Sequence, residues 1–267
     1  MQIIHDSGHP PGTIILAAAM HPRYYEFTTS MDRLEVPAGS KYLIERSCDI
    51  TQNFNQGLKK MSGEWVWFMG DDHAFPPETL MRLLAHNKDV VVPLTPCKVA
   101  AWPPCIIHGP KEGEKIWDER MNLYRWDELS DPGIFKLPMG DFIGQAGMLV
   151  RKRVIDAIGY PWFKCGQFDP GRLQEDMYFC RELQQKGFDV WVDRDIVMEH
   201  YFTIGIGVRK HEGKYAPALQ SGGTTVVLPD AVDLPRRMPD IGEPQRPPVW
   251  RHYTQVEQPH EPAPVHE

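Results

Sequence analysis

The sequence predicts an α/β protein built on a mostly parallel sheet flanked by helices, and three consecutive segments carry this prediction. Residues 65–69 form a short apolar run of aromatic and β-branched residues, which is typical of a strand buried on both faces. The leucines of residues 80–84 fall on one face of a helix, which Pro76-Pro77-Glu78 is expected to open. Asp89–Pro93 is the next expected strand. Strand, helix and strand in this order form a βαβ unit, which implies parallel strands.

Two further strands and a helix are expected before this unit. Residues 13–19 form an apolar run of strand length, which is too short to span a bilayer and has no charged region ahead of it. Residues 41–45 predict a second strand, and apolar residues recurring at helical spacing predict a helix from about Thr51.

After the βαβ unit the pattern becomes irregular. Residues 103–138 are rich in Trp, Gly, Lys and Glu, so they form either a small β-rich excursion that lines a substrate site or a surface insertion. Residues 140–150 place three glycines around a strand, which indicates tight packing, a bend or close approach to a ligand.

The last predicted elements are a helix and two strands. Gly187 ends a helix that starts at about Glu175. The apolar face of this helix also carries Asp176, which is therefore expected to point inward at the helix start. Strands are expected over residues 189–193 and 196–200.

Composition limits the domain organisation and the class of partner. We expect one domain over residues 1–220 and a Pro-rich, disordered tail over residues 221–267, because the tail's composition cannot build a core. The net charge of −7 argues against a protein that grips nucleic acid through its phosphates. The five cysteines form no CxxC pair, which favours free thiols in a reducing compartment and a cytoplasmic location.

The tract that follows the strand of residues 65–69 is the main candidate site. Asp71, Asp72 and His73 come directly after this strand, so they are expected at the carboxyl edge of the sheet, where open α/β folds bind ligands. Two carboxylates beside an imidazole suit a divalent cation such as Mg²⁺ or Mn²⁺. The alternative is a solvated acidic turn before a helix.

Three blocks of the sequence resemble GT-A glycosyltransferases, in particular family 2 and its relatives. Residues 67–72 are similar to the family's aspartate motif after a hydrophobic strand. Residues 144–152 look like the strand beside the diphosphate and acceptor, and residues 174–179 like the Glu-Asp helix start that often supplies the catalytic base. The resemblance covers residues 13–200 and implies a GT-A type, Rossmann-like fold.

The resemblance assigns the metal ligands with one departure from the family pattern. The family often has three consecutive acids, and the first of them is Gly70 here. Asp71 is then implied to approach the ribose or diphosphate, while Asp72 binds the metal. An Asp-x-His interpretation, with Asp71 and His73 as ligands, stays open. His200 resembles the distal histidine of the metal site, or is a surface or packed histidine.

The resemblance also implies the residues that bind the donor and act in catalysis. Asp176 would be the base, with Glu175 beside it. Gly144 and Gln145 would lie along the diphosphate and acceptor. The nucleoside pocket would take Arg46 and residues from the end of the first strand, namely Ala19, His21 or Arg23.

The function that follows from the resemblance is a metal-dependent, hexosyltransferase-like enzyme. It would move a sugar from a nucleoside diphosphate sugar to an acceptor hydroxyl, inverting the anomeric centre with Asp176 as base; retention stays open. The acceptor is a glycan, a protein, a small molecule or a modified nucleic acid. The alternatives are a nucleotidyltransferase of the same fold class and a non-catalytic sugar-binding or protein-binding module. Residues 17–22 are not the glycine-rich, basic loop that nucleotidyltransferases usually carry.

Overall fold

The computed structural model divides the chain into two compact units, which are Met1–Gly205 with Gln220–Val226, and Ile206–Leu219 with Val227–Glu267. Among the residues that the structure describes, no helix is both long and apolar enough to cross a membrane. Most of the expected tail lies outside the described residues. The structure describes residues 1–18, 24–47, 49–98, 102–109, 122–164, 174–202, 205–221 and 224–227.

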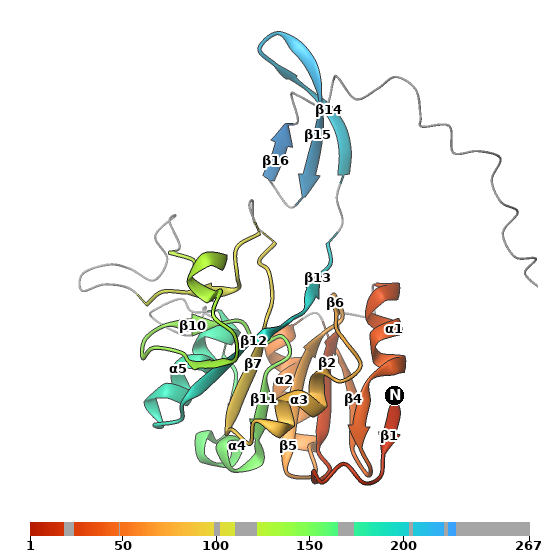
Figure 1. The fold of residues 1–267 in the computed structure, drawn as a ribbon, viewed down its shortest axis with the longest axis vertical. Helices are drawn as coiled ribbons and strands as arrows, with labels where there is room; N and C mark the ends of the chain where they lie inside the picture. Colours follow the sequence, from red (N-terminus) through yellow and green to blue (C-terminus); the bar gives the residue numbers. More distant parts are fainter. Residues whose placement is uncertain are drawn as a thin grey trace, which may run out of the picture. The chain divides into compact units, whose positions relative to one another are not determined.

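A seven-stranded sheet forms the centre of the first unit, in the order β4-β2-β5-β11-β7-β12-β9 (Figure 1). Strands β4, β2, β5, β7 and β12 run in one direction, while β11 and β9 run in the other. The predicted mostly parallel sheet is therefore confirmed. Its strands are β2 Thr13–Ala18, β4 Lys41–Arg46, β5 Trp65–Gly70, β7 Val90–Leu94, β9 Ile134–Lys136, β11 Leu149–Arg151 and β12 Val190–Val197.

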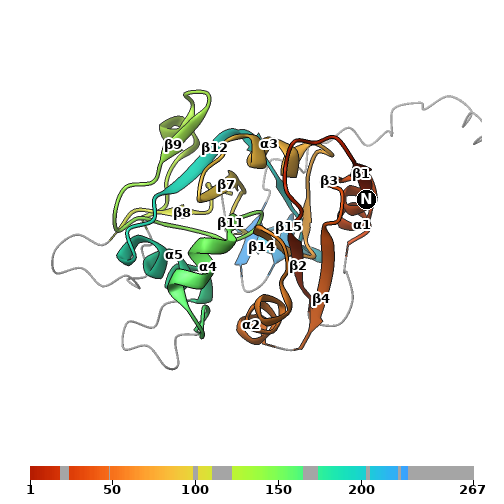
Figure 2. The same ribbon diagram turned by 90° about the horizontal axis from the view of Figure 1, so that it is seen from below.

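Helices cover both faces of this sheet. The apolar residues of α2, α4 and α5 join one core cluster, and those of α1 and α3 join a second cluster on the other face (Figure 2). Strand β5 contributes side chains to both clusters, because its side chains alternate between the two faces of the sheet. All of Trp65–Met69 are fully buried. The helices are α1 Tyr25–Arg33, α2 Ile50–Lys60, α3 Thr79–Ala85, α4 Lys152–Ile158 and α5 Glu175–Gln185.

Shorter strand pairs lie outside the main sheet. In the irregular region, the described part contains the 3₁₀ helix Trp126–Leu129 and β9, which joins the sheet edge beside β12. A separate three-stranded sheet has the order β14-β15-β16. The remaining strands are β1 Gln2–Ile4 with β3 Glu35–Pro37, β6 His73–Ala74 with β13 Glu199–His200, β8 Ile106–Ile107 with β10 Phe142–Ile143, and the three strands β14 Gly205–His211, β15 Lys214–Ser221 and β16 Thr224–Val227.

Two element boundaries differ from the sequence predictions. Helix α3 begins at Thr79 rather than at the prolines, because Pro77 disfavours the helical conformation at Pro76 and the Pro77 carbonyl accepts a hydrogen bond from the Glu35 amide (2.9 Å). The two strands predicted over residues 189–200 begin as one strand, β12, whose register with β7 shifts after Asp193. The segment then pairs with β6 as β13.

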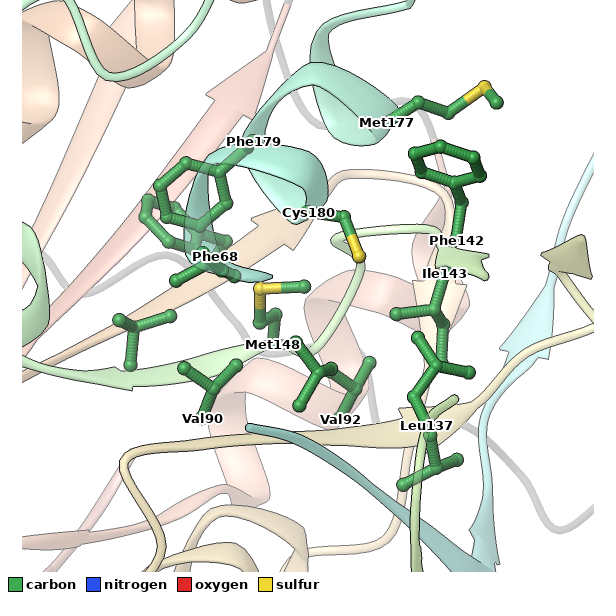
Figure 3. Packing of buried hydrophobic residues seen from close by; sticks show 14 of the residues in the cluster. Phe68, Val90, Val92, Leu137, Phe142, Ile143, Met148, Met177, Phe179 and Cys180 are labelled. Atoms are coloured by element: carbon green, nitrogen blue, oxygen red, sulfur yellow. The ribbon is translucent and has the colours of Figure 1, made fainter. Parts of the chain in front are cut away.

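An aromatic cluster fixes the start of α5 against the sheet. Phe179 stacks on Phe163 with ring centroids 4.4 Å apart and meets the edge of Phe68 on β5 at 5.7 Å. Figure 3 shows Phe179 and Cys180 pointing toward Phe68 and Met148. Burying each large apolar side chain contributes about 1.5–3 kcal/mol, so this packing holds the first turn of α5 at a defined place.

The N-terminus of α2 depends on one capping side chain. Asp49 Oδ1 accepts hydrogen bonds from the backbone amides of Thr51 (2.8 Å) and Gln52 (3.3 Å). We expect Asp49→Ala to lower the free energy of unfolding by about 1 kcal/mol, measured by denaturant titration. Asp49→Asn keeps the acceptor and should cost far less. An equal loss in both variants would show that the charge, rather than the hydrogen bond, stabilises the helix.

Candidate functional site at the carboxyl edge of the sheet

Four segments meet at the carboxyl edge of the parallel strands. Asp71 and Asp72 follow β5, and Thr95–Lys98 follows β7. Strand β11 runs the opposite way, so the loop that precedes it reaches the same edge, where the Gly147 amide donates to the Phe68 carbonyl (2.8 Å). The segment after β12 is tied to the same place, because the Tyr201 amide donates to the Asp72 carbonyl (2.7 Å). Chemistry-bearing residues from distant parts of the chain therefore gather here.

Asp72, His73 and His200 form a cluster in which one ligand atom from each residue lies within 4.8 Å of the others. Strands β6 and β13 lie next to each other (Figure 1). Their pairing sets His73 directly opposite His200, and the two rings stack with centroids 4.1 Å apart. Asp72 Oδ1 lies 2.9 Å from His73 Nδ1, and Asp72 Oδ2 lies 3.6 Å from His200 Nε2. The carboxylate of Asp71 is not part of this cluster.

Hydrogen bonding orients the ring of His200. Its Nδ1 lies 2.8 Å from the carbonyl oxygen of Pro96. A carbonyl oxygen only accepts, so Nδ1 donates its proton to Pro96 and the ring directs Nε2 toward Asp72. His73 is buried, and its Nε2 has no hydrogen-bond partner among the described residues. The cluster thus offers one carboxylate and two imidazoles, a donor set that suits a transition-metal ion.

Electrostatics keep the carboxyl group of Asp72 ionised. Burial raises its pKa, but hydrogen bonds from His200 and His73 outweigh burial and hold the pKa well below its usual range. The Lys98 ammonium adds to this effect through a direct ion pair with Asp72 Oδ2. The pKa of His73 moves downward, mainly because burial disfavours the charged imidazolium. Asp72 is therefore an anion and His73 a neutral base, the forms in which both bind metal ions.

Gly70 lies close to two donor groups of the cluster. A Cβ atom at residue 70 would lie 2.8 Å from Asp72 Oδ1 and 3.2 Å from His73 Nδ1. A side chain at this position would therefore press on the ends of two side chains, and the donor groups of Asp72 and His73 would have to shift to accommodate it.

Asp71 is outside the three-donor cluster and acts electrostatically on Tyr42 of β4. It is buried, and its charge helps to raise the pKa of Tyr42, an effect that comes mainly from burial and is opposed by Arg46. Arg46 is exposed at the carboxyl end of β4, opposite Ala18 of β2. Asp71 and Arg46 therefore both influence the pKa of Tyr42, in opposite directions. The other candidates for this pocket, Ala19, His21 and Arg23, lie outside the described residues.

Asp176 and Glu175 form the first turn of α5. Burial, followed by the neighbouring charge of Glu175, raises the pKa of Asp176 to about 7. The Met177 amide donates to Asp176 Oδ1 (2.7 Å) and works in the opposite direction. The pKa of Glu175 is also raised, first by burial and then by the charge of Asp49. At neutral pH Asp176 is thus poised between its protonated and ionised forms.

The loop before β11 lies against Asp176. A Cβ atom at Gly144 would lie 3.8 Å from Asp176 Oδ2 and 3.3 Å from Cys105 Sγ, so the missing side chain leaves the carboxyl group room. Gln145 is buried, and its Oε1 has no hydrogen-bond partner among the described residues. A buried acceptor of this kind needs a donor, which a water molecule or a bound ligand can supply.

Cys105 and Lys98, which the sequence analysis did not single out, connect the two halves of the site. A hydrogen bond donated by the Cys105 thiol to Cys97, followed by burial, raises the pKa of Cys105, and the charges of Asp176 and Lys98 contribute with opposite signs. Cys105 is held opposite Thr95 by a backbone hydrogen bond (2.7 Å). The only sequence signal for Lys98 is its position shortly after a predicted parallel strand.

Comparisons with known proteins agree with these motifs. The family model described as "Glycosyl transferase family 2" matches residues 42–136. No curated protein is a significant match. Among solved structures, A197 from STIV aligns with 12% identity and a TM-score of 0.44, covering 72% of this chain and 86% of that chain. TarS 1-349 from S. aureus, in complex with UDP-GlcNAc, aligns with 12% identity and a TM-score of 0.43, covering 76% of this chain and 60% of that chain.

The matched region begins in β4 and ends in β9, so it contains the Asp71-Asp72-His73 turn and Lys98 but not α5. The motifs of the sequence and this match agree with each other, and the α/β fold is the one that they imply. The chain is therefore similar to the glycosyltransferases of family 2, with a fold of the GT-A type.

Proposed function

We propose that the protein is a cation-dependent glycosyltransferase that moves a sugar from a nucleoside diphosphate sugar to an acceptor hydroxyl with inversion. The observation that carries the proposal is the shared edge of the sheet: a carboxylate and two imidazoles converge there, and a helix start with a carboxyl group of raised pKa lies at the same edge. The match to family 2 supports the reaction class.

The residues of the cluster fit a divalent cation. Asp72 supplies an oxygen, and His73 and His200 supply nitrogens whose positions are fixed by the β6–β13 pair and the Pro96 carbonyl. Because two of the three donors are imidazoles, we propose Mn²⁺ in preference to Mg²⁺, which favours oxygen ligands. When bound, the cation would neutralise the developing charge on the leaving diphosphate as a Lewis acid.

Asp176 is proposed to take the proton of the attacking acceptor hydroxyl. A general base works best when its pKa is near the working pH, and the pKa of Asp176 is about 7. Gly144 leaves space next to its Oδ2, and Gln145 offers an unpaired acceptor in the same loop for a hydroxyl of the bound sugar. Asp71 and Arg46 are proposed to contact the nucleoside part of the donor.

A donor panel tests this function. We expect the protein with Mn²⁺ to hydrolyse one class of nucleoside diphosphate sugar slowly, releasing the nucleoside diphosphate, and to stop after exhaustive chelation. Activity that resists chelation would contradict the cation-dependent proposal. Release of pyrophosphate from a nucleoside triphosphate and a sugar phosphate would identify a nucleotidyltransferase instead. Binding of a sugar nucleotide without turnover, with a range of acceptors present, would identify a binding module.

A further inference from the structure

Lys98 and the two histidines approach the same carboxylate. The Lys98 Nζ donates to Asp72 Oδ2, and this is the oxygen that lies 3.6 Å from His200 Nε2. The other oxygen, Oδ1, faces His73. The ammonium therefore lies at the edge of the three-donor cluster rather than on an unrelated side of Asp72.

An ammonium and a divalent cation compete for such a carboxylate. A cation that contacts Asp72, His73 and His200 would lie among donor atoms that are all within 4.8 Å of one another, and the Lys98 charge would then be only a few ångströms away. Like charges at this separation repel strongly in a partly buried site. A lysine carries one rotatable point charge on a flexible chain, so it can leave a carboxylate more easily than an arginine held by two hydrogen bonds.

We propose that Lys98 is a built-in counter-cation of Asp72, which leaves the carboxylate when a divalent cation binds and thereby sets the cation affinity of the site. This inference rests on the cation site of the proposed function and deepens it. The side chain of Lys98 is 31% exposed, so it has room to move toward solvent. While it is paired, Lys98 also keeps Asp72 satisfied and oriented.

The consequence is a measurable competition. The apparent dissociation constant of a ligand rises when its binding-competent state is only partly populated, and here that state requires Lys98 to have left Asp72. Lys98→Met removes the charge but keeps most of the apolar stem, so we expect Mn²⁺ to bind this variant about tenfold more tightly than the wild-type protein. If Lys98 acted only on the substrate and did not pair with Asp72, its removal would leave the affinity for Mn²⁺ alone unchanged.

The experiment is isothermal titration of the full chain with Mn²⁺ alone, without donor or acceptor. Lys60→Met is the matched control, because Lys60 also forms an ion pair with a carboxylate, Glu45 (2.7 Å), but on the α2 side of the sheet. It should leave Mn²⁺ affinity unchanged. Asp72→Asn should abolish Mn²⁺ binding, which shows that the titrated site is this one.

A second measurement needs no variant. Reductive methylation followed by mass spectrometry reports how accessible each lysine amine is, and saturating Mn²⁺ should raise the modification rate of Lys98 several-fold while leaving Lys60 unchanged. Unchanged Mn²⁺ affinity in Lys98→Met, or unchanged labelling of Lys98, would overturn the role of Lys98. The cation site itself would still be supported if Mn²⁺ binding depended on Asp72. Absence of Asp72-dependent Mn²⁺ binding in both wild type and Lys98→Met would overturn the cation site itself, and this inference with it.

Discussion

Asp176→Asn is expected to lower turnover by roughly 10²–10⁴-fold while donor affinity stays nearly constant. Asparagine has the size of aspartate and can still accept the hydrogen bond from the Met177 amide, but it cannot take a proton from the acceptor. Steady-state kinetics with the donor identified by the panel would measure the change. Product stereochemistry by NMR of the wild-type reaction would then test inversion.

The pKa of Asp176 predicts a pH profile and a stability effect. If Asp176 must be ionised, kcat should rise with pH through a midpoint near 7, the pKa of this group. Glu175→Gln removes a charge that raises this pKa, so the midpoint should move downward. The folded-state pKa lies above the usual 3.8, so Asp176 favours folding when protonated, and this contribution is lost as pH rises through 7.

At pH 8 the free energy of unfolding of Asp176→Asn should therefore exceed that of the wild type by roughly 1–3 kcal/mol. Below about pH 4 the variant should have no such advantage, because Asp176 is protonated there in the wild type. Thermal unfolding at several pH values would measure this. Near-normal turnover in the variant would reduce Asp176 to a helix-start residue and favour a retaining mechanism. Lost donor binding would instead place its carboxylate beside the diphosphate.

Asp72→Asn has the second large effect, because it removes the only carboxylate of the three-donor cluster. We expect Mn²⁺ binding to be abolished and turnover to fall by at least about 10²–10³-fold. The pKa of Asp72 is held well below 3.8, so its ionised form stabilises the fold at neutral pH, and this contribution is lost as pH falls from about 4 toward the folded-state pKa. The variant should lose roughly 1–3 kcal/mol at pH 7.

Asp193→Asn is a matched control for this loss of stability. Asp193 is buried and paired with a histidine, since its Oδ2 lies 2.7 Å from His86 Nε2, but it has no contact with the cluster among the described residues. This variant should lose stability and keep Mn²⁺ binding. Equal loss of Mn²⁺ binding in both variants would mean that damage to the fold, rather than removal of a ligand, explains the effect of Asp72→Asn.

The central strands could be predicted because a continuous apolar run indicates a strand that is buried on both faces. Every residue of Trp65–Met69 is apolar, and each of them is fully buried between the two helical layers. The directions of β11 and β9 could not be predicted in the same way. Each has only three residues, and its direction depends on the path of the chain between elements rather than on local preference.

From the residue pattern alone, without the family resemblance, the candidate site was predictable only where it follows a long strand. Asp71, Asp72 and His73 come directly after β5, so their place at the sheet edge follows from the strand itself. His200 reaches the cluster through a two-residue strand pair, and no periodicity in the sequence signals such a short pairing. The roles of Gly70 and Lys98 depend on distances to side chains that only the folded chain brings together.

The position of β11 also has a consequence for how the chain folds. This strand fills the gap between β5 and β7, although it comes long after both of them in the sequence. Until β11 has been synthesised, the facing edges of β5 and β7 have backbone amides and carbonyls without a strand partner. The Trp67 indole, which donates to the Gly147 carbonyl in the folded protein (2.7 Å), also lacks its acceptor until then. Closure of the sheet is thus a late, non-local step, which slows folding and exposes apolar strand edges to other chains until residues 149–151 arrive.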